Sequence, residues 1–220
     1  MKILLSILLM ITTTHAFEHK FFQSEIPATD FNNVTVSQAI QALQRKSKDI
    51  QGSKSGFNYV FSTKASKKLN QKISISLTVL PLDDAIKYTA MVSDLRIKFE
   101  AGTVLFMANG EKYKDPIVKD KFTRFSPQML HALKLKIDDM NFEGTKLSEA
   151  GKTIQKSARA IDPQKKGVNL LIINANPKTK VTMNTQGLPI YSLLKYMAFS
   201  AGVTMKMERA AIIFTSAKGK

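Results

Sequence analysis

The sequence contains no cysteine, and this absence excludes several classes of protein and site. Disulfide bridges and cysteine-ligated metal sites are impossible, and no cysteine is present to carry the lipid of a bacterial lipoprotein. Long apolar runs are scarce too, because after the run Ile3–Ile11 no stretch approaches the roughly 20 residues that a membrane-spanning helix needs. We therefore expect no transmembrane segment after residue 16, and a fold held together by burial alone.

The signatures of catalytic and cofactor sites are also missing. The sequence has no glycine-rich phosphate loop and no His-Glu-x-x-His motif, and its histidines beyond residue 16 stand in no Ser/His/Asp or metal-ligand arrangement. The pairs Asp83-Asp84 and Asp138-Asp139 could act as acid/base pairs, but a helix start and a solvated strand edge are the favoured interpretations. We expect a protein that is not an enzyme, with no cofactor and no metal; a hydrolase is the least favoured function.

The N-terminus has the parts of a secretory signal. Met1 and Lys2 give a basic start, Ile3–Ile11 a short apolar core, and Thr14 and Ala16 the small residues of a cleavage site. The sequence predicts a signal peptide over residues 1–16, cleaved after Ala16, and an exported protein that stays in the periplasm or is secreted. A buried N-terminal helix is the alternative.

Positive charge is concentrated in the C-terminal half. The formal net charge is +16, of which residues 17–110 contribute +4, residues 111–132 contribute +2 and residues 133–220 contribute +9. Such a charge distribution favours contact with polyanions.

The sequence also contains an internal repeat. Residues 36–61 align with 147–172 at an offset of 111, and residues 80–102 align with 188–210 at an offset of 108. The length difference falls in a polar, lysine-rich stretch where a loop is expected. Identical pairs include Ser37/Ser148, Ala39/Ala150, Gln44/Gln155, Gly56/Gly167, Pro81/Pro189, Lys87/Lys195, Tyr88/Tyr196, Lys98/Lys206 and Glu100/Glu208. The chain is a duplication, with a first module at 17–110, an extended linker at 111–132 and a second module at 133–220.

Both copies predict the same order of elements. An extended segment (26–31 and 134–142) leads into an amphipathic helix, a short strand buried on both faces and an alternating strand. A second helix then starts at Pro81 or Pro189, and a hairpin closes the copy. The predicted core positions of the helices are Val36, Ala39, Ile40, Leu43 and Ile50; Leu147, Ala150, Ile154, Ala158 and Ile161; Leu82, Ala85, Ile86, Thr89 and Ala90; and Ile190, Leu193, Leu194, Met197 and Ala198. The fold class is α+β, as two tandem β-α-β-β-α-β-β modules, each a small sheet with two helices on one face.

This pattern resembles a known family. The segments that carry the resemblance are "IPATDFNN" and "LKIDDMNFEG", the helix "VSQAIQALQRKS", the stretch "KISISLTVLPLDDAIKYTA" and the linker "YKDPIVKDKFTRFSP". The chain resembles the short N-terminal (STN) domain of secretins and TonB-dependent receptors, in the tandem form of secretin-like envelope proteins of planctomycete and verrucomicrobial type bacteria. The resemblance implies a periplasmic module that docks on protein partners by adding strands or packing helices.

Lysines form the most visible polar feature. They occupy the loops before the alternating strand of each copy and one loop at the other end of the buried strand. The candidate polyanion contacts are Lys64, Lys67, Lys68, Lys72, Lys165, Lys166, Lys178 and Lys180. Exposed lysines that serve solubility are the alternative, and no aromatic residues interleave with them to stack bases.

The second helix of each copy has an additional apolar stripe. At 100° per residue, Tyr88 and Met91 lie away from the core stripe, and Tyr196 and Phe199 do the same in the second copy. The stripe either packs against the other module or the linker, or it docks a partner protein.

Two functions follow from these patterns. The first is a non-enzymatic periplasmic adaptor that contributes protein-protein contacts to an envelope assembly for secretion or uptake, with a secretin-like or receptor-like partner. The second is a binder of an anionic envelope polymer or DNA through the basic C-terminal module.

Overall fold

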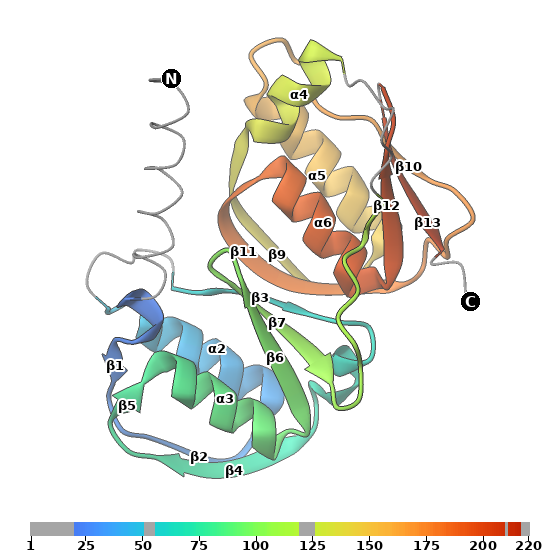
Figure 1. The fold of residues 1–220 in the computed structure, drawn as a ribbon. Coiled ribbons are helices and arrows are strands. Elements are labelled where there is room, and N and C mark those ends of the chain that lie inside the picture. The colour runs from blue at the N-terminus through green and yellow to red at the C-terminus, as the bar shows by residue number, and fades with distance from the viewer. Residues whose placement is uncertain (1–19, 51–55, 119–125, 210, 217–220) are drawn as a thin grey trace, which may run out of the picture. The chain divides into compact units, whose positions relative to one another are not determined.

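The computed structural model describes residues 20–50, 56–118, 126–209 and 211–216 (Figure 1). The expected signal peptide and its cleavage site lie outside these residues. The chain divides into two compact units. The first unit comprises Met1–Asn58 and Lys67–Asn109, and the second comprises Tyr59–Ser66 and Gly110–Lys220.

The described part of the first unit contains two complete helices, a helical stretch at residues 20–22 and three pairs of strands. Strand β2 pairs with β4, β1 pairs with β5, and β6 and β7 form an antiparallel hairpin. The bounds are β1 Glu25–Ile26, β2 Thr29–Thr35, α2 Val36–Ser47, β4 Lys72–Leu77, β5 Leu80–Pro81, α3 Leu82–Val92, β6 Leu95–Glu100 and β7 Thr103–Ala108.

The second unit repeats this order with additions. Strands β9 and β11 pair in place of β2 and β4, and β12 and β13 form the closing hairpin, with β10 along one edge and β8 along the other. The bounds are β8 Ile117–Val118, α4 Pro127–Lys134, β9 Lys136–Lys146, α5 Leu147–Ile161, β10 Leu170–Ile172, β11 Lys180–Pro189, α6 Ile190–Ala201, β12 Val203–Met207 and β13 Ile212–Ser216. The expected extended linker, 111–132, therefore holds β8 and most of α4.

The α+β class is confirmed, but the layers differ from the expected single sheet. In the first unit α2 and α3 lie between the β2–β4 pair and the β6–β7 hairpin, and in the second α5 and α6 lie between β9–β11 and the β12–β13 sheet (Figure 1). The reason is visible in α6, whose buried residues lie on more than one side of the helix. A helix that is apolar over so much of its surface must be covered from two sides.

Strand β3, Asn58–Phe61, belongs to the first copy in sequence but forms part of the second unit through Tyr59–Ser66. It pairs antiparallel with β11, with Phe61 opposite Thr182 and Tyr59 opposite Asn184. A short helical turn at Ala65–Lys68 follows it. The second unit thus contains a β3-β11-β9 sheet that takes one strand from the first copy.

The predicted core stripes of the helices are confirmed at all but two positions. Ile161 is exposed at the last residue of α5, and Ile50 is only half-buried beyond the end of α2. Strand β10 also differs from the expectation of burial on both faces, because Leu171 is exposed. None of the helices in the described ranges combines the length and apolarity needed to cross a membrane.

Candidate docking surface

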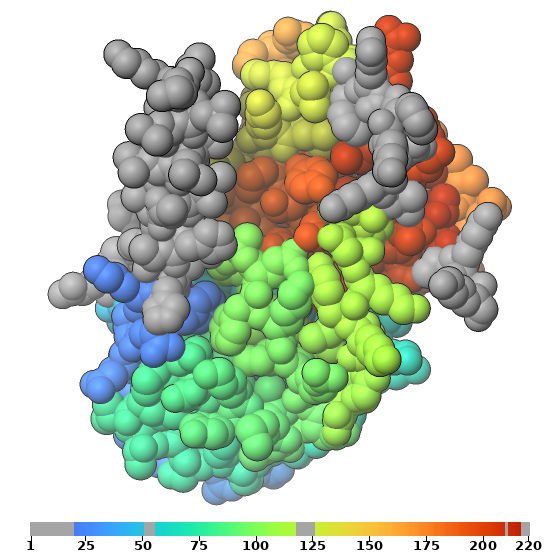
Figure 2. Space-filling view, viewed as in Figure 1, coloured from blue at the N-terminus to red at the C-terminus, as the bar shows by residue number. Residues whose placement is uncertain are grey.

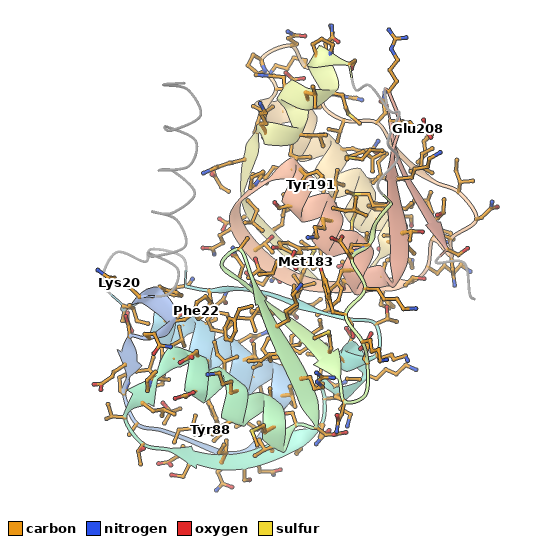
Figure 3. The ribbon with its side chains drawn as sticks, in the orientation of Figure 1. Lys20, Phe22, Tyr88, Met183, Tyr191 and Glu208 are labelled. Carbon is orange, nitrogen blue, oxygen red and sulfur yellow. The ribbon has the colours of Figure 1, made fainter. Side chains whose placement is uncertain are left out.

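The second apolar stripe of α3 lies on the surface of the first unit. Tyr88 is 46% exposed and Met91 69% exposed, and the neighbouring Val92 is exposed as well. Tyr88 projects from the outer side of α3 in Figure 3, and Figure 2 shows the green surface of this helix on the face in view. Exposed apolar side chains gathered on one face are typical of a contact site.

The equivalent stripe of α6 is buried. Tyr196 and Phe199 are 3% and 9% exposed. The Tyr113 ring lies against Phe199 with 5.7 Å between ring centroids, so residues of the expected linker cover this part of the stripe. The two copies therefore differ, and of the four candidate docking residues only those on α3 are accessible.

The covering segment also extends the β12 sheet. The Met205 amide donates a 2.7 Å hydrogen bond to the Pro116 carbonyl, and β8 runs parallel to β12 with Ile117 opposite Met205. Asp115 approaches the Lys195 ammonium at 4.0 Å. One extended segment, residues 113–118, therefore places an aromatic ring, a carboxylate and a strand against α6 and β12; we call it the cover segment.

The first unit has the same surface without a cover. Strand β6 corresponds to β12, and Ile97 lies opposite Phe106 as Met205 lies opposite Phe214. No strand of the described chain other than β7 is paired with β6. Ile97 is half-buried whereas Met205 is fully buried, which reflects the uncovered edge.

The charges beside the two surfaces differ. On α3, the Lys87 ammonium donates hydrogen bonds of 2.8 Å to Asp83 and 2.9 Å to Asp84. These bonds raise the pKa of Lys87, the bond to Asp83 most strongly. The two carboxylates outnumber the one ammonium, so this end of α3 is negative. On α6 the corresponding positions are Tyr191 and Ser192, and Lys195 faces the cover segment instead.

The candidate polyanion lysines do not form one cluster. In the second unit Lys178 and Lys180 lie at the start of α5, because the Ser148 amide bonds to the Pro177 carbonyl, while Lys165 and Lys166 follow the end of that helix. A helix of 15 residues separates the two pairs by roughly 22 Å. Lys64 lies elsewhere in the same unit.

The lysines of the first unit are also dispersed. Lys67 is exposed, Lys68 forms a 2.6 Å ion pair with Asp94, and Lys72 lies on β4 beside Thr35. The Lys68 bond lowers the pKa of Asp94. This lysine has a partner within its own unit.

Sequence reasoning missed the cover segment and the exposed Val92. Tyr113 and Asp115 stand in a stretch that reads as a linker, and only the Pro-Ile-Val sequence after them indicates an extended strand. Their role depends on contacts with residues 80 or more positions away, which local patterns do not show.

Across the described ranges, no three or more His, Cys, Asp or Glu side chains are grouped so that they could hold a metal ion. No family model, curated protein or solved structure matches this chain.

Proposed function

We propose that this protein is a non-enzymatic adaptor that binds a partner protein at the surface of its first unit. One observation carries the proposal: α3 and β6 present the surface that the cover segment fills on α6 and β12, but the stripe on α3 is exposed. An exposed apolar stripe beside an unpaired strand edge suits the addition of an extended peptide segment.

The cover segment indicates how the partner binds. A partner segment would run parallel to β6, pair with Ile97 and place an aromatic ring on Met91, as Tyr113 lies on Phe199. Met91 is suited to this contact because a thioether packs well against an aromatic ring.

Charge distinguishes the partner segment from the cover segment. Asp83 and Asp84 outnumber Lys87, so the position taken by Asp115 in the cover segment should be basic in the partner. A like charge at that place would be repelled. The partner segment should therefore contain an aromatic residue, a basic residue two positions later, and two β-branched residues at the positions that correspond to Ile117 and Val118.

The setting we propose is the bacterial envelope. The N-terminal signal pattern and the resemblance to the secretin and TonB-receptor short N-terminal domain support an exported, periplasmic or secreted protein. The partner would then be a secretin-like or receptor-like component of a secretion or uptake assembly.

Peptide binding to the full chain tests the proposal. The probe is a labelled peptide of residues 111–118, "EKYKDPIV", compared with the same peptide carrying Asp115→Lys. We expect the Asp115→Lys peptide to bind about threefold tighter, since an exposed charge pair contributes roughly 0.5–1 kcal/mol. Met91→Asp in the protein should reduce the affinity for this peptide at least tenfold, because it places a charge under the tyrosine ring of the peptide. Fluorescence anisotropy measures both.

The matched control is Leu130→Asp, an exposed leucine on α4 of the second unit. It should leave peptide affinity and melting temperature unchanged. Equal affinity of both protein variants would contradict docking at α3. A crosslinker placed at position 91 in the intact envelope then identifies the partner, and its capture should be lost with Tyr88→Asp.

The basic lysines support a second function, binding of an anionic envelope polymer or DNA. The observation that favours it is a small cluster at the start of α5, where Lys180 lies directly opposite Lys146 on β9 and Lys178 is exposed nearby. The Lys146 ammonium donates a 3.0 Å hydrogen bond to the Glu149 carboxylate, so Lys178 and Lys180 are the charges of this cluster that an external anion would contact. Steep loss of binding with salt would identify this function.

A further inference from the structure

Strand β10 ends the sheet of the second unit. It pairs in parallel with β13, and the bonds from Ile173 to the Phe214 carbonyl and from Ile212 to the Asn169 carbonyl are both 2.8 Å. Residues 169, 171 and 173 therefore direct their backbone groups toward β13, and by alternation Leu170 and Ile172 direct theirs to the opposite edge. No strand of the described chain is paired with that edge.

Exposed apolar side chains accompany this edge. Leu171 is 46% exposed and Ile173 is 43% exposed. An unpaired edge with large exposed apolar residues is a template for pairing with another chain, and stable monomers usually protect such edges.

Strand β4 of the first unit carries the complementary edge. It corresponds to β11, and it pairs with β2 on one side as β11 pairs with β9. In the second unit β3 occupies the other edge of β11, whereas no described strand occupies the corresponding edge of β4 in the first unit.

The pairing of β3 with β11 supplies the register. Strand β3 corresponds to β10 at an offset of 111, and β11 corresponds to β4 at an offset of 108. The observed pairs Tyr59 with Asn184 and Phe61 with Thr182 thus translate into Leu170 with Ser76 and Ile172 with Ser74.

The segment after β3 shows a second contact of the same kind. The Thr63 hydroxyl donates a 2.7 Å hydrogen bond to the Ser200 carbonyl at the end of α6. Thr63 corresponds to Asn174 and Ser200 corresponds to Val92. Val92 is exposed on α3, so an incoming β10 segment would cover it.

We propose that copies of this chain join head to tail, with β10 of one copy adding to the β4 edge of the next. The two edges belong to different parts of the surface, so the contact is heterologous and leaves one edge open at each end of every oligomer. The chain's own β3–β11 pairing is the model for the contact, which is why the occupant is a second copy.

Sedimentation velocity of the full chain over a range of concentrations tests the proposal. We expect the mass to rise continuously beyond that of a dimer. Ile172→Pro removes the amide that would donate to β4, while the bonds of β10 to β13, which use residues 171 and 173, remain. Val92→Lys places a charge under the incoming segment from an already exposed position. Each variant alone should remain monomeric over the whole concentration range.

Mixing the two variants gives the decisive measurement. Ile172→Pro keeps its β4 edge and Val92→Lys keeps its β10 edge, so the mixture should form a one-to-one dimer that does not grow. Circular dichroism checks that both variants keep the wild-type fold, and Leu171→Lys replaces Ile172→Pro if the latter unfolds. A wild-type chain that stays monomeric at all concentrations, a closed dimer, or a mixture that remains monomeric would each overturn the proposal.

Discussion

At the scale of single residues, Gly56 and Gly167 show why the repeat keeps certain positions. Both have positive φ, +71° and +61°. A Cβ on Gly56 would lie 2.6 Å from the Gln44 carbonyl oxygen, and one on Gly167 would lie 2.9 Å from the Arg159 amide nitrogen. In each copy the chain passes so close to the preceding helix that only glycine fits.

We expect Gly56→Ala to destabilise the protein by about 2–4 kcal/mol, as the sum of a left-handed alanine and an overpacked contact. The control is Gly110→Ala, where φ is +76° but no atom lies within 4 Å of the added Cβ. It should cost only about 1 kcal/mol. Urea unfolding measures both, and equal losses would show that backbone strain alone explains Gly56.

Asp162 organises the loop between α5 and β10. Its buried carboxylate accepts hydrogen bonds from the amides of Gly167 at 2.8 Å and of Gln164 and Lys166 at 3.0 Å. These donors, Gly167 first, hold the pKa of Asp162 below its ordinary value. A depressed pKa means that the stabilisation is complete above the unfolded pKa of about 3.9 and is lost as pH falls through the folded pKa.

Asp162→Asn should therefore lower the melting temperature at pH 7, and the difference from wild type should shrink below about pH 4. Asp138→Asn, an exposed aspartate on β9, should show no such difference. Thermal unfolding followed at several pH values checks this. A constant difference across the pH range would mean that the charge of Asp162 does not contribute.

At the scale of elements, helices were more predictable than sheets. The stripes Val36 to Leu43 and Leu82 to Ala90 repeat at 3.6 residues, and that period alone places them in the core. The β6–β7 and β12–β13 hairpins were predicted equally well, because their strands are neighbours in sequence. Local patterns sufficed for these elements.

Pairing between distant strands could not be predicted. Val60 and Phe61 indicate a buried strand, but no local feature tells which strands lie beside it. Its pairing with β11, more than 100 residues later, could not be predicted. The docking stripes show the same limit: Tyr88 and Tyr196 occupy equivalent positions, yet one is exposed and the other is buried. Exposure depends on what covers the helix, as Tyr113 covers Phe199, and that contact is non-local.

At the scale of the whole molecule, the difference between the two corresponding halves of the chain explains the proposed contacts. The second copy has its α6 surface covered by the segment 113–118 and its β11 edge paired with β3. The first copy has neither cover. The α3 surface and the β4 edge of the first copy therefore stay exposed. We expect a partner protein to bind at the α3 surface and a second chain to bind at the β4 edge.

Salt separates the proposed self-assembly from polyanion binding, because the two respond with opposite sign. Each chain carries a net charge of +16, so copies repel one another and salt should strengthen their association. The Debye length falls from about 10 Å at 0.1 M to about 3 Å at 1 M, which removes most of that repulsion while the apolar contacts of Leu171 and Val92 persist. Binding to a short DNA duplex should instead weaken with salt, by counterion release. Sedimentation velocity measures the self-assembly and fluorescence anisotropy measures DNA binding, both over the same series of salt concentrations. Self-assembly that weakens as salt rises would show that charge, rather than strand pairing, holds the copies together.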